Sequence, residues 1–395
     1  MKFAPVARRP ATVIAAAVVW FALFVPNLTT SAAAGARPQH VFIIVLENEG
    51  FNKTFGPKSP APYLNQLAAQ GALLTQYYGI GHNSLDNYVA MVSGQAPNPK
   101  TQSDCHDYVP FLQVGIADYG QAIGDGCIYQ RNVLTVANQL ESRGLTWKGY
   151  MEDMGNDPAR ESASCGQPAI YFPDSTQKAE ARDQYAARHN PFVYFYSILD
   201  SGTDCAEHVV NFSALAADLK RIGTTPNYSY ITPNLCHDGH DGGSRKNPCA
   251  NGEIGGLFSA DVFLKNTVPK ILASPAFRRD GLLIVTFDES DVDWNGPAVT
   301  GDASSCCHEQ PGPNIHPGAT VFGAPDHGPG IVGPGGGRIG AVLVSPFIKP
   351  SRTSAVPYNH YAMLRSIEDF FGLEHLGYAG QQGLRTFGTD RNIFN

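Results

Sequence analysis

The chain has 395 residues and a formal net charge of −7, with 43% hydrophobic and only 16% charged residues. This composition is typical of a globular protein and excludes a disordered or coiled-coil chain. The acidic balance argues against a nucleic-acid partner, which requires a basic surface, and against attraction to anionic membranes.

The first part of the chain, residues 1–35, has the pattern of a secretory signal peptide. Basic residues come first, an apolar segment spans residues 11–25, and small residues at 31–34 offer a cleavage site. The apolar segment is shorter than the ~20 residues that a membrane span needs. We therefore predict a secreted protein without stable membrane insertion, in which residues 36–395 form a single domain.

Short apolar runs alternate with amphipathic segments along the rest of the chain. The run Phe42–Leu46 stops at Glu47-Asn48, as expected for a strand that is buried on both faces. Further strands are predicted at 73–78, 147–150, 228–231, 282–287 and 339–344, and helices at 61–70, 87–92, 134–142, 261–271 and 361–371. The alternation predicts an α/β fold with a mainly parallel central sheet flanked by helices.

Eight cysteines in a chain with an export signal predict disulfide bonds, because such bonds persist in oxidising compartments. No CxxC pair is present, which argues against a zinc ribbon or a thioredoxin-like site. Proximity in the sequence favours the pairs Cys105–Cys127, Cys165–Cys205, Cys236–Cys249 and Cys306–Cys307.

Paired polar residues follow two of the apolar strands. Glu47-Asn48 ends the first strand, and Asp288-Glu289 ends the strand at 282–287. The carboxyl ends of parallel strands meet at one edge of a sheet, and oxygen ligands suit hard cations. We predict that these four residues hold one divalent metal ion, whose identity (Mg, Ca, Mn or Zn) the sequence leaves open. The alternative for each pair alone is a helix cap or a turn.

A serine and three histidines complete the predicted constellation. Ser84 precedes a predicted helix, whose N-terminus would favour an oxyanion, so we expect it to act as a nucleophile. His82, His237 and His240 are expected to donate to phosphoryl charge or to protonate a leaving alkoxide. This chemistry is phosphoryl transfer. The chain lacks the GxSxG, GxxxxGK[ST] and HExxH motifs of rival hydrolases and nucleotide-binding proteins.

Several segments together carry a family resemblance. They are HVFIIVLEN, YGIGHNSLDNYVAMVSG, YMEDM, HNPFVYF, YITPNLCHDGHD, GLLIVTFDES and YNHYAMLRSIEDFFGL. In these segments the chain resembles the phosphoesterase family that joins acid phosphatases and bacterial phospholipases C, within the alkaline phosphatase-like superfamily. It is most similar to secreted acid phosphatases of the SapM type. The resemblance implies an alkaline phosphatase-like fold with a single metal site.

The resemblance also implies roles for individual residues. These are Glu47, Asn48, Asp288 and Glu289 as metal ligands, Ser84 as nucleophile, Asn87 as a substrate-binding amide and His240 as the histidine of the DGH segment. Many relatives read HPSLPNY, whereas this chain has Asn83 and Asp86 in place of the two prolines. We therefore expect a more flexible loop and an additional negative charge near the phosphate. No role is implied for His308, His327 or His360.

The function expected from these features is that of a secreted, metal-dependent acid phosphatase. It would hydrolyse small phosphate monoesters, with phosphoinositides among the candidate substrates, through a serine nucleophile. One alternative is a phospholipase C-like phosphodiesterase, which needs room for a second ester substituent. Another is a non-catalytic secreted binding protein on the same scaffold. A sulfatase is disfavoured because no C-x-P-x-R segment occurs. The oligomeric state is not predicted.

Overall fold

The computed structural model describes residues 1–4, 37–200, 205–293, 300–315 and 335–394. The helices are α1 (Phe51–Phe55), α2 (Pro62–Gln70), α3 (Ser84–Ser93), α4 (Val136–Ser142), α5 (Tyr196–Leu199), α6 (Cys205–His208), α7 (Leu215–Asp218), α8 (Gly256–Ala273), α9 (Pro275–Asp280) and α10 (His360–Phe371). The strands are β1 (His40–Leu46), β2 (Ala72–Leu74), β3 (Tyr77–Tyr78), β4 (Asp107–Tyr108), β5 (Leu112–Ile116), β6 (Ala122–Asp125), β7 (Trp147–Met151), β8 (Phe172–Pro173), β9 (Val209–Asn211), β10 (Tyr228–Thr232), β11 (Gly281–Phe287), β12 (Val292–Asp293), β13 (Thr300–Gly301), β14 (Ala341–Val344), β15 (Arg352–Ser354) and β16 (Tyr358–Asn359).

The main sheet of the described residues has the order β15-β2-β14-β11-β1-β10-β7-β9. The strands from β11 to β9 run parallel to one another, whereas β14 is antiparallel to both of its neighbours. All residues of β1 and β11 are buried, which explains their continuous apolar sequences. The predicted α/β fold with a mainly parallel sheet is therefore confirmed.

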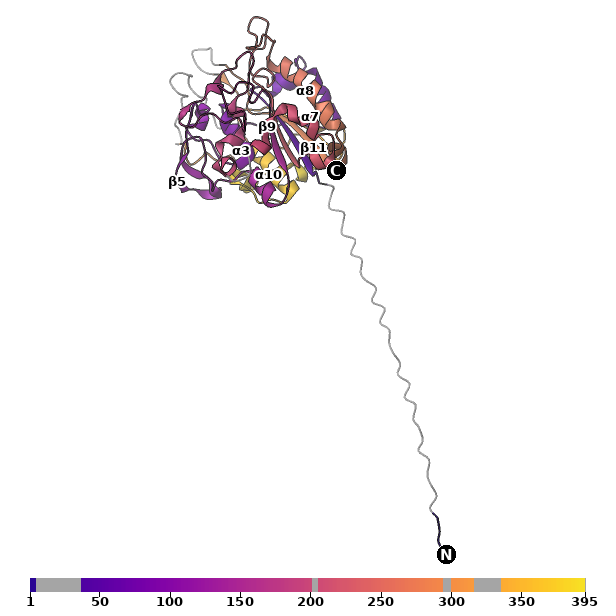
Figure 1. The fold of residues 1–395 in the computed structure, drawn as a ribbon. Coiled ribbons are helices and arrows are strands. Elements are labelled where there is room, and N and C mark those ends of the chain that lie inside the picture. Colours follow the sequence, from indigo (N-terminus) through magenta and orange to yellow (C-terminus); the bar gives the residue numbers. More distant parts are fainter. Residues whose placement is uncertain (5–36, 201–204, 294–299, 316–334, 395) are drawn as a thin grey trace. The chain divides into compact units, whose positions relative to one another are not determined.

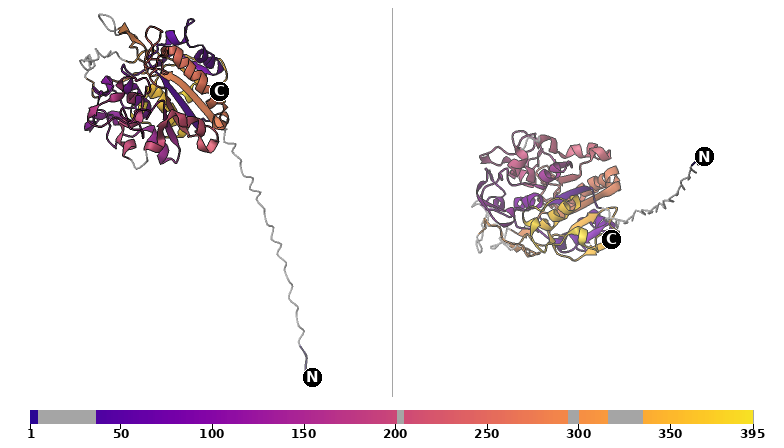
Figure 2. Two further views of the ribbon diagram at one scale, coloured as in Figure 1. Left: turned by 45° about the horizontal axis from the view of Figure 1, so that its top comes forward. Right: turned by 90° about the horizontal axis from the view of Figure 1, so that it is seen from below.

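Helices cover both faces of this sheet. Helix α2 packs against α8, and α9 contacts both α8 and β1, which places these three helices in one layer. Helices α3, α4 and α10 contact one another in the other layer, and α4 also contacts β7. Figures 1 and 2 show the strands between α8 and the pair α3 and α10.

The register between β1 and β11 determines where the functional residues meet. Leu46 at the end of β1 pairs with Phe287 at the end of β11. Glu47 and Asp288, the next residues on each strand, therefore emerge side by side at the carboxyl edge of the sheet. The prediction that the two strands end at one edge is confirmed.

Helix α3 begins three residues earlier than the predicted helix at 87–92. Asn83 precedes it with a φ angle of 81°, a left-handed conformation that asparagine adopts more readily than most residues. Asp104 Oδ1 accepts a hydrogen bond from the backbone N–H of Leu85 at 3.0 Å and so satisfies an amide of the first turn. Ser84 is consequently the first helical residue. The predicted strand at 73–78 is divided into β2 and β3.

The structure contains all four predicted disulfides, Cys105–Cys127, Cys165–Cys205, Cys236–Cys249 and Cys306–Cys307. Within the described ranges, no helix has both the length and the apolar character needed to cross a bilayer. The chain separates into residues 1–35 and 36–395. The predicted signal peptide lies almost wholly in residues 5–36, outside the described residues. His327 also lies outside the described residues.

Helix α10 carries a buried acid that predicts a pH-dependent stability. Burial raises the pKa of Glu368 to about 9, although the hydrogen bond from the Leu376 amide lowers it. In the unfolded chain this carboxyl group has a pKa of about 4.3. Between that pH and the pKa of the folded state, the folded protein keeps a proton that the unfolded chain loses. The free energy of unfolding must then fall as the pH rises from about 4.5 towards 9.

Replacing Glu368 by glutamine should remove this loss of stability. We expect similar stability of the two proteins at acidic pH, and a variant more stable by on the order of 2 kcal/mol at slightly alkaline pH. Urea unfolding of both proteins at the two pH values measures the difference. A stability difference that does not change with pH would contradict an uncharged Glu368.

Candidate active site

Glu47 lies at the centre of the cluster that forms at the sheet edge. Its side chain is 1% exposed, and it accepts hydrogen bonds from Ser84 Oγ at 2.7 Å and from Tyr88 Oη at 2.6 Å. Ser84 and Tyr88 are one turn apart on α3, so both hydroxyls face the same side of the helix. Burial and the nearby charges of Asp288 and Asp238 raise the pKa of Glu47 well above its usual value. The Ser84 hydroxyl is thus held by an unusually basic carboxylate.

Asp288 is fixed by backbone amides on one oxygen and leaves the other available. Its Oδ1 accepts hydrogen bonds from the N–H groups of Asn48 at 3.0 Å and Glu289 at 2.6 Å. Burial raises the pKa of Asp288 to about 6, although these two hydrogen bonds lower it. Asp288 Oδ2 and Asn48 Oδ1 are both buried and have no hydrogen-bond partner among the described residues.

These unpaired oxygens fit a divalent cation better than they fit a closed protein core. Buried polar atoms are normally paired, and neighbouring carboxylates repel unless a cation lies between them. Glu47, Asn48 and Asp288 would supply two carboxylates and an amide oxygen. Within the described ranges, no group of three or more His, Cys, Asp or Glu side chains is arranged to hold a metal ion. The set formed by Glu47, Asn48 and Asp288 contains only two carboxylates and so falls below that number. Metal binding stays a prediction.

Glu289, the fourth predicted ligand, faces protein groups instead. Its Oε2 accepts a hydrogen bond from Asn87 Nδ2 at 3.1 Å, and its Oε1 lies 3.5 Å from His82 Nδ1. Burial, followed by the charge of Asp288, raises the pKa of Glu289 well above its usual value. Glu289 therefore joins the Ser84 loop to the strand end, next to the proposed ligands.

Asn87 and His82 hold the loop that leads into α3. Asn87 Oδ1 accepts hydrogen bonds from the amides of Ile80 at 2.7 Å and Gly81 at 3.2 Å, and its Nδ2 donates to Gly81 O at 3.0 Å. His82 Nε2 donates to the carbonyl of Asp302 at 3.1 Å, and burial lowers the pKa of His82. The Asn87 amide is thus occupied by the loop, and a direct contact with substrate would require it to exchange a partner.

The two other predicted histidines lie in different surroundings. The amide of His240 donates to Asp238 at 2.9 Å, while its imidazole pairs with Asp241 at 3.0 Å and is 43% exposed. Burial lowers the pKa of His240, but the hydrogen bond with Asp241 and the charge of Asp238 raise it overall. His240 is therefore at the rim of the cluster.

His237 points into a separate group of ion pairs. Its two ring nitrogens lie 3.0 Å from Glu152 and 3.0 Å from Glu253. These partners outweigh burial and raise the pKa of His237 to about 9. Because both nitrogens are engaged there, the structure does not bring His237 together with Ser84 and Glu47.

His189, which the sequence analysis assigned no role, does enter the cluster. Its Nε2 lies 3.3 Å from Glu47 Oε1 and its Nδ1 lies 3.5 Å from Asp238 Oδ2. Its ring stacks on Tyr88, with the ring centres 5.2 Å apart. Burial, together with the charges of Arg188 and His240, lowers the pKa of His189 well below its usual value. The HNPFVYF segment was the available signal for this residue.

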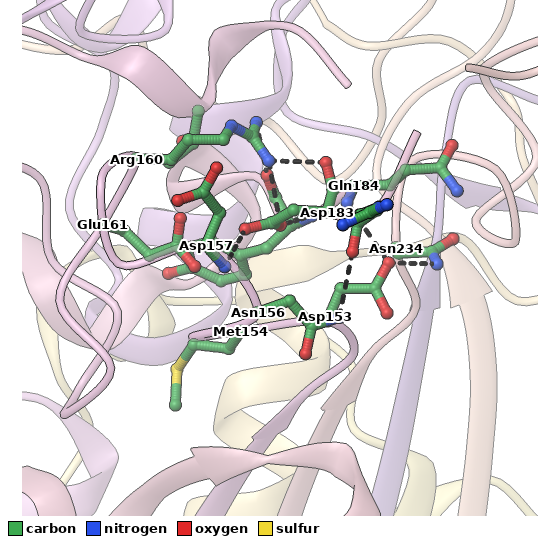
Figure 3. Close-up of polar contacts among 12 residues, drawn as sticks. Asp153, Met154, Asn156, Asp157, Arg160, Glu161, Asp183, Gln184 and Asn234 are labelled. Atoms are coloured by element: carbon green, nitrogen blue, oxygen red, sulfur yellow. Dashed lines mark hydrogen bonds and ion pairs between the residues drawn. The ribbon is translucent and has the colours of Figure 1, made fainter. Parts of the chain in front are cut away.

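A polar network behind the cluster positions the segments that carry His189 and Asp238 (Figure 3). Asp153 Oδ2 accepts hydrogen bonds from the Gln184 amide at 3.2 Å and from Asn234 Nδ2 at 2.8 Å. Gln184 precedes His189, and Asn234 precedes Asp238, so one carboxylate ties both segments together. A buried ion pair between Arg160 and Asp183 at 2.8 Å lies beside it.

His360, the first residue of α10, supports the site from the same layer as α3. Its Nε2 donates to the carbonyl oxygen of Asp288 at 2.6 Å, and its Nδ1 is 3.1 Å from the Tyr77 hydroxyl. Burial lowers the pKa of His360 to about 4, so the ring is neutral. A neutral ring that donates through Nε2 accepts through Nδ1, and this arrangement fixes the backbone at the end of β11.

Replacing His189 by glutamine should lower kcat by about 10²-fold, because a neutral ring between Glu47 and Asp238 is suited to proton transfer and glutamine is not. Steady-state hydrolysis of p-nitrophenyl phosphate measures the effect. His375→Gln is the matched control, since His375 pairs with Asp369 at 2.9 Å near the end of α10. An unchanged kcat in His189→Gln would remove His189 from the active cluster.

Sequence comparison shows the family of this chain. The model of the Phosphoesterase family matches residues 57–374. The chain therefore belongs to the Phosphoesterase family. The matched range includes Ser84, His189, Asp288 and His360, whereas Glu47 and Asn48 lie just before it.

The curated relatives include fungal and bacterial phosphatases. A probable acid phosphatase of Kluyveromyces lactis is 29% identical over 263 residues, which cover 66% of this chain and 50% of that protein. A phosphatidylinositol-3-phosphatase of Mycobacterium tuberculosis is 27% identical over 267 residues, covering 68% of this chain and 69% of that protein. The match thus spans about half the length of the fungal relatives.

Solved structures show a weaker similarity. A protein in the alkaline phosphatase superfamily from Vibrio parahaemolyticus is 14% identical, with a TM-score of 0.45, covering 86% of this chain and 67% of that one. The lipoteichoic acid synthase LtaP of Listeria monocytogenes is 9% identical, with the same TM-score of 0.45, covering 91% and 76%. At this level the similarity says nothing about activity.

Proposed function

We propose that this chain is a secreted, metal-dependent acid phosphatase that hydrolyses phosphate monoesters through Ser84. One observation carries the proposal above all. The Ser84 hydroxyl donates to the buried Glu47 carboxylate at 2.7 Å, beside the unpaired oxygens of Asn48 and Asp288. The relatives named as acid phosphatases support the same reaction class.

In the proposed reaction, Ser84 Oγ attacks phosphorus and the alcohol leaves from the opposite side. Glu47, which accepts the hydrogen bond from Ser84 Oγ, is placed to take up the hydroxyl proton. The N-terminal end of α3, where Ser84 lies, favours negative charge through the helix dipole. A divalent cation held by Glu47, Asn48 and Asp288 would neutralise the carboxylates and polarise the phosphoryl oxygens.

Two histidines, His189 and His240, then transfer protons. His189 lies between Glu47 and Asp238 and can pass a proton between the two carboxylates, since its ring is neutral. His240, exposed at the rim and with a raised pKa, is the cationic donor available to the leaving alkoxide. Water releases inorganic phosphate from the phosphoseryl intermediate in the second half of the reaction.

The test compares p-nitrophenyl phosphate with bis-p-nitrophenyl phosphate between about pH 4 and pH 8, before and after treatment with EDTA. We expect release from the monoester that EDTA abolishes and added divalent metal restores. Turnover of the diester alone would establish a phosphodiesterase instead. Turnover of neither would support a binding protein on this scaffold.

Phosphoinositides are the proposed lipid substrates, on the basis of the Mycobacterium tuberculosis relative named a phosphatidylinositol-3-phosphatase. Phosphate release from short-chain, soluble phosphatidylinositol 3-phosphate tests this point without a membrane. A kcat/KM at least equal to that for p-nitrophenyl phosphate is expected. A much lower value would restrict the substrates to small esters.

A further inference from the structure

A polar cleft of about 540 Å³ adjoins the candidate active site and takes no part in the reaction described above. Its volume is in the range of small-molecule sites. The lining residues come from Gly50 and α1, from the last residues of β3 and β13, from the segments after β11 and β13, and from the loop before β14. They are Gly50, Phe51, Asn52, Lys53, Tyr78, Ser290, Asp291, Gly301, Asp302, Ser304 and Arg338.

The cleft is built from the same segments that carry the catalytic cluster. Gly50 follows Glu47-Asn48, and Ser290 directly follows Asp288-Glu289. The Gly50 amide donates to Asp291 Oδ1 at 3.0 Å, which joins the two segments. His82 lies between the cluster and the cleft, because one ring nitrogen is 3.5 Å from Glu289 and the other binds the carbonyl of Asp302. The cleft therefore lies beside the segments that carry the cluster, and His82 forms the wall between them.

Arg338 is held rigidly in the wall of this cleft. Its guanidinium lies over the ring of Phe51, with Cζ 4.4 Å from the ring centre. Its Nη2 donates to Asn52 Oδ1 at 2.9 Å, and its backbone amide donates to Asp302 Oδ2 at 3.0 Å. The hydrogen bond to Asn52 uses one of the five N–H donors of the Arg338 guanidinium, so the other four are not used by it. Asn52 accepts this bond through its oxygen and keeps its NH₂ group as a further donor. These contacts hold the Arg338 side chain in one position, with donors available to a ligand in the cleft.

The charges of the lining select the type of occupant. Two cations, Lys53 and Arg338, are balanced by two carboxylates, Asp291 and Asp302, and Lys53 also pairs with Glu49 at 2.8 Å. A second phosphate would be repelled by the carboxylates, and an alkyl chain would leave the polar groups without partners. Hydroxyl groups both donate and accept, so several hydroxyls on one ligand would match this mixed lining.

We propose that this cleft is a leaving-group subsite for a polyhydroxylated alcohol, a sugar or a cyclitol, whose hydroxyls bind Arg338, Asn52 and Asp291. The proposal rests on the proposed phosphatase function and deepens it, because it assigns the substrate class. The enzyme then prefers phosphate esters of polyols over those of simple alcohols with the same number of carbons.

The experiment compares glucose 6-phosphate with n-hexyl phosphate in the wild type, in Arg338→Met and in Asn52→Ala. Methionine keeps the apolar contact with Phe51 and removes the donors. Arg278→Met, at an exposed arginine of α9, is the matched control. We expect kcat/KM for glucose 6-phosphate to fall about tenfold in both cleft variants, and that for n-hexyl phosphate to change less than about twofold.

Two outcomes overturn the subsite, namely equal losses for both esters and no loss for either. Binding of free glucose, followed by NMR in wild type and Arg338→Met, gives a readout that does not depend on turnover. A protein that binds glucose through Arg338 yet hydrolyses no ester would refute the phosphatase and support the subsite. An active phosphatase in which Arg338→Met leaves glucose binding unchanged would refute the subsite alone.

Discussion

Ser84→Ala should lower phosphate release from p-nitrophenyl phosphate by about 10³-fold or more. The proposed nucleophile is lost, and the remaining groups can only position water. Glu47 loses the hydrogen bond from Ser84 but keeps that from Tyr88, so the fold should persist. Initial rates at substrate saturation, measured with protein of unchanged circular dichroism, test the expectation.

Trapping separates a nucleophile from a merely structural serine. Acid quenching during turnover followed by mass spectrometry should find phosphate on the peptide that contains Ser84 in the wild type. Ser213→Ala, at an exposed serine, is the control and should retain full activity. Rapid release by Ser84→Ala, or phosphate on another residue, would move the nucleophile elsewhere.

Asp288→Asn should reduce activity by about 10²-fold or more and weaken metal binding at least about tenfold. Asparagine keeps an oxygen that can accept the hydrogen bonds from the Asn48 and Glu289 amides, and removes the negative charge. The loss of activity should therefore come with little change in fold. Metal titration by calorimetry and recovery of activity after EDTA treatment measure the two effects.

Asp261→Asn provides a closely matched control for this substitution. Asp261 also accepts two backbone hydrogen bonds, from Leu64 at 2.8 Å and Tyr63 at 3.1 Å, but it does so at the start of α2. It should leave activity and metal affinity unchanged. If Asp288→Asn bound metal as tightly as the wild type, Asp288 would not be a ligand.

The local pattern of the sequence was sufficient for the fold class and for the meeting of two strand ends at one edge of the sheet. Phe42–Leu46 and the run at 282–287 are continuous and apolar because helices cover both faces of the sheet. Their ends predicted that Glu47 and Asp288 meet, and the register of β1 and β11 confirms this. Four disulfides joined neighbouring cysteines, so proximity in the sequence predicted them correctly.

Only the tertiary structure decided which histidine joins the cluster. His189 and His237 both lie outside the predicted strands, in the segments HNPFVYF and YITPNLCHDGHD, and neither segment shows which histidine meets Glu47. Asp153 ties the segments of His189 and Asp238 together and brings His189 against Glu47, whereas Glu152 and Glu253 engage His237. Such contacts join residues far apart in the chain through loops without periodicity. The periodicity of a sequence predicts which face of a helix or strand is buried. It does not predict these contacts, because they depend on how separate loops pack against one another.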